Sequence, residues 1–136
     1  MTVSNTAFLV CLPSPTPPTP AFVCCRYWAL QFHGLRDLVC ESPRSVAQSL
    51  AFCAGWAATG GKSGASFEKT SDERFVIKHV KSTELDMFVH NGAKFFQHMF
   101  RVLFQGQPSL LVKYVGAYKV QVHDHVAVRS CVTFLT

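Results

Sequence analysis

The residues best suited to chemistry lie between Gly60 and Lys78, where the glycine-rich segment GGKSGAS precedes a lysine set among apolar residues. Glycine lets backbone N–H groups approach a phosphate closely, and a lysine ammonium supplies the positive charge that such a ligand needs. Glu84 follows, and its carboxylate would hold Lys78 in place and keep it charged. The sequence therefore predicts a nucleotide-phosphate site.

Two other motif similarities do not hold. Gly61-Lys62-Ser63 has the end of a P-loop, but Trp56 occupies the position where that motif requires its first glycine. Arg36-Asp37-Leu38 has the start of a kinase catalytic loop, yet it precedes the glycine segment and no asparagine follows at the required distance. We interpret this tripeptide as surface charge on a helix.

The cysteines and histidines do not predict a metal site. The six cysteines contain no CxxC pair and no histidine at zinc-ligand spacing. His123 and His125 flank Asp124, but alternate residues of a short turn usually point apart. No secretory signal is evident, and the apolar stretch Ala7–Leu12 is too short to span a membrane. We therefore expect buried, reduced thiols in a cytoplasmic protein.

Composition predicts one domain with an unusually apolar surface. The 136 residues suffice for one hydrophobic core, and 49% of them are apolar. Only 15% are charged and the mean hydropathy is +0.18, which indicates membrane contact or a face that a partner covers. The net charge of +5 is dispersed, which favours anionic ligands or lipid headgroups and not nucleic acid.

The residues before the glycine segment predict a leader and two helices. Residues 1–21 include PSPTPPTP, whose prolines favour a disordered leader or spacer, with a docking motif for an aromatic groove as the alternative. Apolar residues recur at helical spacing over 26–40. Pro43 suits the first turn of a second helix, whose apolar face would include Cys53.

The residues after the glycine segment predict a hairpin, a long helix and two further strands. Lys78 falls on the second strand of the hairpin and Glu84 at the start of the helix, while Gly116 marks a possible bulge. In order, the expected elements are strands 64–70 and 74–80, a helix over 83–103, and strands 110–122 and 126–134. This order predicts the α+β class.

These residues resemble a known family. From Phe22 to Val122 the chain is similar to the amino-terminal part of the phosphatidylinositol phosphate kinase domain, and most of all to the phosphatidylinositol 3-phosphate 5-kinase branch, whose full-length members carry a FYVE finger. The pieces that match are Cys25-Arg26-Tyr27, Gln31-Phe32-His33, Leu35-Arg36, Ser49-Leu50, Trp56, GGKSGASF from Gly60, DERFVIK from Asp72, Glu84, Phe88 and GAYKV from Gly116. Thr59 and Glu68 depart from the pattern of that branch, and Glu68 would repel phosphates if it faced the cleft.

The resemblance implies a fold and a site. The fold would be the amino-terminal lobe of a lipid-kinase, protein-kinase-like fold, with an antiparallel sheet, flanking helices and no carboxyl-terminal lobe, in a domain over 22–136. Lys78 would be the ATP-binding lysine and Glu84 its ion-pair partner. The loop that covers the phosphates would comprise Gly60, Gly61, Lys62, Ser63, Gly64, Ala65 and Ser66.

The resemblance also implies a function, for which two interpretations stay open. The first is a kinase that uses Mg²⁺-ATP to phosphorylate a phosphoinositide at an endosomal membrane surface. The branch that the chain resembles implies phosphatidylinositol 3-phosphate as the substrate and the 5-position as the site of phosphorylation. The family's metal-binding and substrate-selecting segments have no counterpart after Lys78, so we expect the chain to be inactive alone. The second is a non-catalytic module that binds a protein partner through an exposed face of the lobe.

Overall fold

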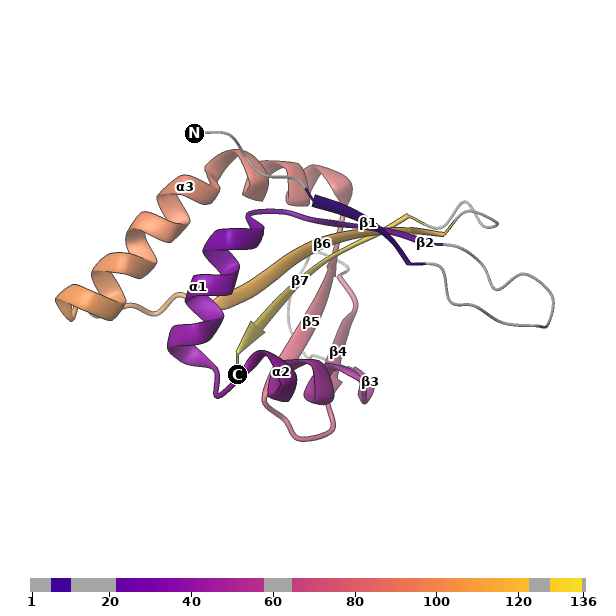
Figure 1. Ribbon diagram of the computed structural model, residues 1–136, viewed down its shortest axis with the longest axis horizontal. Helices are drawn as coiled ribbons and strands as arrows, with labels where there is room; N and C mark the ends of the chain where they lie inside the picture. Colours follow the sequence, from indigo (N-terminus) through magenta and orange to yellow (C-terminus); the bar gives the residue numbers. More distant parts are fainter. Residues whose placement is uncertain (1–5, 11–21, 58–64, 123–127, 136) are drawn as a thin grey trace.

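The computed structural model describes residues 6–10, 22–57, 65–122 and 128–135, which form one seven-stranded antiparallel sheet with three helices (Figure 1). In chain order the elements are β1 Thr6–Val10, β2 Phe22–Arg26, α1 Ala29–Val39, α2 Pro43–Leu50, β3 Cys53–Trp56, β4 Phe67–Thr70, β5 Phe75–Val80, α3 Ser82–Gln105, β6 Tyr114–Val122 and β7 Val128–Leu135.

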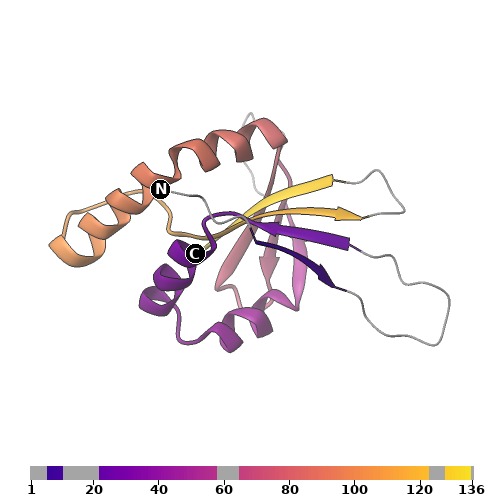
Figure 2. The same ribbon diagram turned by 45° about the horizontal axis from the view of Figure 1, so that its top comes forward.

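The order of strands in the sheet is β1-β2-β6-β7-β5-β4-β3, and each neighbouring pair is antiparallel. Helices α1 and α3 lie side by side at one end, while β1, β2, β6 and β7 extend away from them (Figures 1 and 2). The predicted α+β class, with an antiparallel sheet and flanking helices, is confirmed.

The region before the glycine segment differs most from the sequence prediction. Within the predicted leader, Thr6–Val10 forms β1 and pairs with β2. The helix predicted over 26–40 begins only at Ala29, because Trp28 adopts a left-handed backbone with φ of 52° and separates the helix from β2. Cys53 lies in β3 instead of α2, because β3 pairs with β4. These strands depend on partners distant in sequence, which local periodicity does not report.

The second half follows the prediction closely. The hairpin forms as β4 and β5, and α3 is slightly longer than predicted, because it ends at Gln105 and is followed by the left-handed cap residue Gly106, whose φ is 67°. The register of β6 against β7 shifts between Tyr114 and Gly116, which confirms the predicted bulge. Strand β6 begins at Tyr114 instead of residue 110, so the preceding apolar residues form a loop.

The core lies between α1, α3 and the sheet. Phe32 of α1 is buried, and its ring lies 6.0 Å from that of Phe88 and 5.0 Å from that of Phe96, both on α3. A smaller cluster joins Val46 of α2 with Phe75 and Val115 of the sheet. The aromatic contacts attach α3 to α1, and this fixes the helix that carries Glu84.

Arg36 has a structural role that the interpretation of the sequence missed. Its Nη1 donates a hydrogen bond of 2.7 Å to the backbone oxygen of Val115, within the bulge of β6. A bulge interrupts the ladder of hydrogen bonds and leaves backbone groups to be satisfied by other donors. The interpretation of Arg36 as surface charge is therefore wrong, whereas Asp37 is exposed.

Candidate functional site

The candidate site is centred on an ion pair between Lys78 of β5 and Glu84 of α3. The ammonium of Lys78 donates to Oε1 of Glu84. Strand β5 ends at Val80 and α3 begins at Ser82, so a single intervening residue turns the chain and brings the first turn of the helix beside the strand. Glu84 lies in the first turn of α3, where the helix dipole stabilises the negative charge of its carboxylate.

The two side chains differ in exposure. Lys78 is 20% exposed and Glu84 is 47% exposed. The lysine is thus partly removed from water at a place where only one described carboxylate contacts it. The ammonium has further donor positions for an anionic ligand, because a lysine ammonium has three N–H donors.

The strand register places aromatic side chains on the face that Lys78 occupies. Lys78 is paired with Phe67, and Phe67 with Trp56, so all three project from one face. The rings of Trp56 and Phe67 pack edge to face, with centroids 6.0 Å apart. An apolar surface therefore adjoins the ammonium, which suits a ligand with a ring and an anionic group.

Glu68 projects from the opposite face. It is paired with Ile77, one residue from Lys78 along β5, and its Oε1 lies 2.9 Å from Nε2 of His79. Successive residues of a strand alternate between faces. The charge of Glu68 is thus directed away from Lys78 and turned toward His79.

Only the end of the glycine segment is placed. Gly60, Gly61, Lys62, Ser63 and Gly64 lie outside the described residues. Ala65 and Ser66 lead into β4, and the backbone oxygen of Ser66 accepts from the backbone N–H of His79 at 2.9 Å. The end of the segment is therefore attached to β5 immediately beside Lys78.

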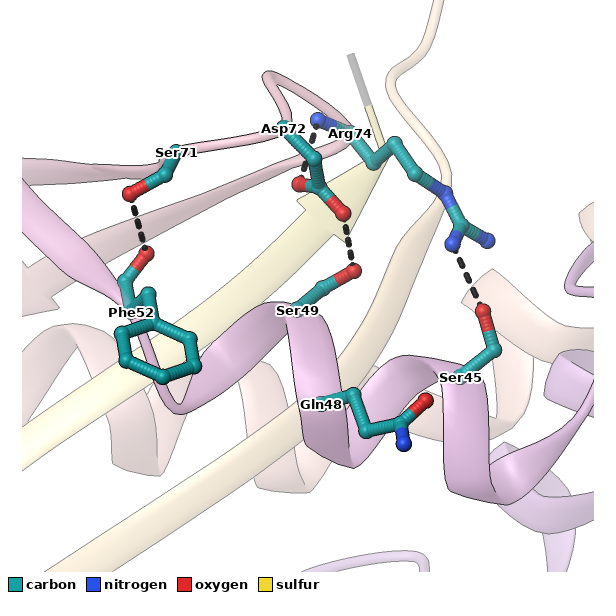
Figure 3. A pocket seen from close by; sticks show the side chains of 7 residues that line it. All are labelled: Ser45, Gln48, Ser49, Phe52, Ser71, Asp72 and Arg74. Atoms are coloured by element: carbon teal, nitrogen blue, oxygen red, sulfur yellow. Dashed lines mark hydrogen bonds between the residues drawn. The ribbon is translucent and has the colours of Figure 1, made fainter.

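A second feature, a cavity of about 440 Å³, was missed by the sequence reasoning (Figure 3). It lies between α2 and the turn joining β4 to β5. Its lining comprises Ser45, Gln48, Ser49, Phe52, Ser71, Asp72 and Arg74. Arg74 directly precedes β5 and lies four residues before Lys78, which is about 13 Å at the strand rise of about 3.3 Å per residue. The cavity is therefore separate from the ion pair.

The polar groups of this cavity hold α2 against the turn. Ser49 donates to Asp72, and Nη1 of Arg74 donates to Oγ of Ser45 at 2.6 Å, as Figure 3 shows. Hydrogen bonds from Ser49 and then Thr70 lower the pKa of Asp72 below its usual value. In the sequence, only the serines of α2 and the polar residues of the turn hint at this arrangement. The hydrogen bonds between them hold α2 against the turn.

No metal site is evident among the described residues, where no group of three or more histidine, cysteine, aspartate or glutamate side chains is arranged to hold an ion. His123 and His125 lie outside the part of the chain that is described. Cys24, Cys25, Cys40 and Cys53 are free and half-buried, not fully buried as expected. Burial raises the pKa of the Cys24, Cys40 and Cys53 thiols, so these three are poor nucleophiles.

Comparison with known proteins relates this chain to a family of lipid kinases. A family model described as phosphatidylinositol-4-phosphate 5-kinase matches residues 56–134. A putative 1-phosphatidylinositol-3-phosphate 5-kinase of Arabidopsis thaliana is 42% identical over 96 residues, which are 71% of this chain and 6% of that protein. The 1-phosphatidylinositol 3-phosphate 5-kinase of Homo sapiens is 33% identical over 100 residues, 73% of this chain and 5% of its own length.

The corresponding enzyme of Saccharomyces cerevisiae is 32% identical over 103 residues, which are 76% of this chain and 4% of that protein. The chain thus spans only a small part of the length of these relatives. The family match covers β4, β5 with Lys78, α3 with Glu84, all of β6 and most of β7, which together make up most of the described sheet. The chain belongs to the phosphatidylinositol-4-phosphate 5-kinase family, and so to the phosphoinositide kinases.

Proposed function

We propose that this chain is the ATP-binding lobe of a phosphoinositide kinase, and that the lipid substrate is phosphatidylinositol 3-phosphate, phosphorylated at the 5-position. The observation that carries the proposal is the ion pair between Lys78 and Glu84, beside the end of the glycine segment. In kinases a strand lysine of this type contacts nucleotide phosphates and a helix glutamate orients it. The names of the similar proteins support the choice of lipid.

Each residue has a defined role in this proposal. The ammonium of Lys78 binds phosphate oxygens, and Glu84 orients it through the ion pair. The backbone N–H groups of the segment from Gly60 to Ser66 cover the phosphates, since glycines permit close approach. Phe67 and Trp56 supply the apolar surface on the same face. Glu68 does not oppose the phosphates, because it projects from the other face.

The chain alone is proposed to bind nucleotide without turning it over. Phosphoryl transfer requires carboxylates that hold Mg²⁺ and a residue that orients the attacking hydroxyl. The described residues offer no such cluster, and the aspartates after Lys78 are only Asp86 and Asp124. The groups that hold Mg²⁺ would have to come from another part of the kinase domain.

The proposed place of action is the cytosolic face of an endosomal membrane, with peripheral contact and ATP and a phosphoinositide as ligands. None of the helices in the described ranges has the length and apolar character to cross a bilayer. The chain has a net charge of +5 that is dispersed along the sequence, and this suits contact with a surface of anionic headgroups.

Calorimetric titration of the 136-residue chain with Mg²⁺-ATP tests the nucleotide site. We expect binding that Lys78→Ala abolishes and that Lys94→Ala, which removes an exposed charge from α3, leaves unchanged. Circular dichroism of each variant would verify that the fold is kept. Absence of binding by the unmutated chain would overturn the ATP-binding proposal and favour a non-catalytic interaction module.

A separate assay tests the proposed lack of turnover. The purified chain is incubated with Mg²⁺-ATP and vesicles that contain phosphatidylinositol 3-phosphate, and the lipid products are separated. We expect no doubly phosphorylated lipid above background. Sustained turnover that Lys78→Ala removes would show that this chain carries a complete active site.

A further inference from the structure

The loop between α3 and β6 presents an unusual run of exposed apolar side chains. Leu110 is fully exposed (105%), Leu111 is 61% exposed and Val112 is 45% exposed. Three consecutive apolar residues in water are unfavourable and are uncommon on a protein surface unless something covers them. We call residues 106–113 the apolar loop.

The apolar loop is held in place by hydrogen bonds. Gly106, with φ of 67°, ends α3 and turns the chain back. Oγ of Ser109 lies 2.9 Å from Nε2 of His98 on α3 and accepts from the backbone N–H of Leu111 at 3.1 Å. Ser109 thus attaches the chain to α3 directly before the apolar residues, and its bond to Leu111 fixes the turn on which they lie.

The charged residues on both sides of the apolar loop in the sequence have one sign. From Met87 to Val122 the sequence contains Lys94, Arg101, Lys113 and Lys119 and no aspartate or glutamate. Lys94, Arg101 and Lys113 are exposed. In this stretch of sequence the apolar residues are therefore accompanied by basic residues and by no acidic residue. Contact with a neutral apolar groove would not require this bias.

An anionic bilayer has the complementary chemistry. Basic residues near such a surface gain electrostatic attraction, and apolar side chains gain by entering the boundary between headgroups and acyl chains. Figures 1 and 2 both show the end of α3 and the apolar loop projecting beyond the sheet. A flat surface can therefore approach this end of the molecule.

We propose that the apolar loop is a membrane-contact site, at which Leu110 and Leu111 enter an anionic bilayer while Arg101 and Lys113 contact headgroup phosphates. This inference deepens the membrane contact of the proposed function, on which it rests, by naming the residues that make it. It is independent of nucleotide binding at Lys78, so the two can fail separately.

Co-sedimentation with vesicles tests the proposal. The chain is mixed with phosphatidylcholine vesicles, with or without phosphatidylserine, and the bound fraction is measured. We expect binding only to the vesicles with phosphatidylserine, and weaker binding as salt screens the charges. The double variant Leu110→Ser, Leu111→Ser has no leucine side chains to insert at these positions. Its partitioning onto the anionic vesicles should be weaker by at least about tenfold.

Two further variants separate the contributions. Lys113→Gln should weaken binding to anionic vesicles by severalfold, and added salt should then reduce the binding less steeply. Phe52→Ser is the matched control, because Phe52 is also apolar and 71% exposed but lies between α2 and β3. We expect it to bind vesicles as the unmutated chain does.

The proposal fails if the unmutated chain does not bind anionic vesicles, or if the double variant binds as well as Phe52→Ser. It also fails if the chain self-associates in light scattering, the double variant is monomeric, and neither binds vesicles, since a second copy then covers the loop. Titration with Mg²⁺-ATP on the same samples reports the nucleotide site independently. Leu110→Ser alone, at a fully exposed position, replaces the double variant if the latter does not fold.

Discussion

Trp28 fills a notch that Gly92 leaves on the surface of α3. A Cβ at residue 92 would stand 2.3 Å from Nε1 of Trp28, and Nε1 donates a hydrogen bond of 3.1 Å to the backbone oxygen of Val89. The indole is also buried, and its ring lies 5.6 Å from that of Phe96. This contact fixes the junction of β2 and α1 against the helix that carries Glu84.

Gly92→Ala should destabilise the protein by about 1–3 kcal/mol, the usual cost of overpacking a core. Helix propensity alone predicts the opposite, because alanine is favoured over glycine by about 1 kcal/mol within a helix. Urea denaturation followed by circular dichroism measures the change. Gly34→Ala is the matched control: residue 34 is also helical, a Cβ there meets nothing within 4 Å, and we expect increased stability. Equal effects of the two substitutions would refute the notch.

Glu84→Gln should separate stability from ligand binding. An ion pair with this much exposure contributes about 0–1 kcal/mol, so the free energy of unfolding should change little. If Glu84 orients Lys78 for phosphate, affinity for Mg²⁺-ATP should fall by roughly tenfold, the range of one charge-assisted hydrogen bond. Calorimetry and urea denaturation on the same sample decide between the effects. A large loss of stability with unchanged affinity would contradict this role.

Asp72→Asn should flatten the acid side of the stability profile. Because hydrogen bonds from Ser49 and Thr70 lower the pKa of Asp72 in the folded state, its carboxylate stabilises the protein above the unfolded pKa, near 3.9. That contribution is lost as pH falls through the lower folded pKa. The variant should therefore be less stable near pH 6, and the difference should diminish below about pH 4. Urea midpoints across this pH range measure it, and parallel profiles would contradict it.

Arg36→Met should cost about 1.5–3 kcal/mol, the range for a hydrogen bond with a charged partner. Methionine keeps much of the apolar stem but leaves the oxygen of Val115 without its Arg36 donor in the bulge of β6. Urea denaturation measures the loss. Asp37→Asn, at the exposed neighbouring position, is the control and should have little effect. If Arg36→Met leaves the free energy of unfolding unchanged, then solvent supplies the hydrogen bond to the backbone oxygen of Val115.

The sequence by itself determined the elements whose signals are local. The hairpin, α3 and the bulge at Gly116 follow from alternation, helical spacing and glycine. Lys78 and Glu84 could be paired because the sequence places the lysine on a strand and the glutamate at the start of the helix that follows it. The family could be recognised largely from the same stretch, because the segments GGKSGASF and DERFVIK are each continuous in the sequence.

The tertiary structure alone decided what depends on distant partners. Strands β2 and β3 form because β6 and β4 supply their hydrogen bonds, and Glu68 is known to avoid Lys78 only from the strand register. Trp28 takes a left-handed backbone, and its indole fits the notch at Gly92, 64 positions along the chain. Local pattern reports the preference of a segment, whereas packing and strand pairing select among preferences, and they act between residues that the sequence does not bring together.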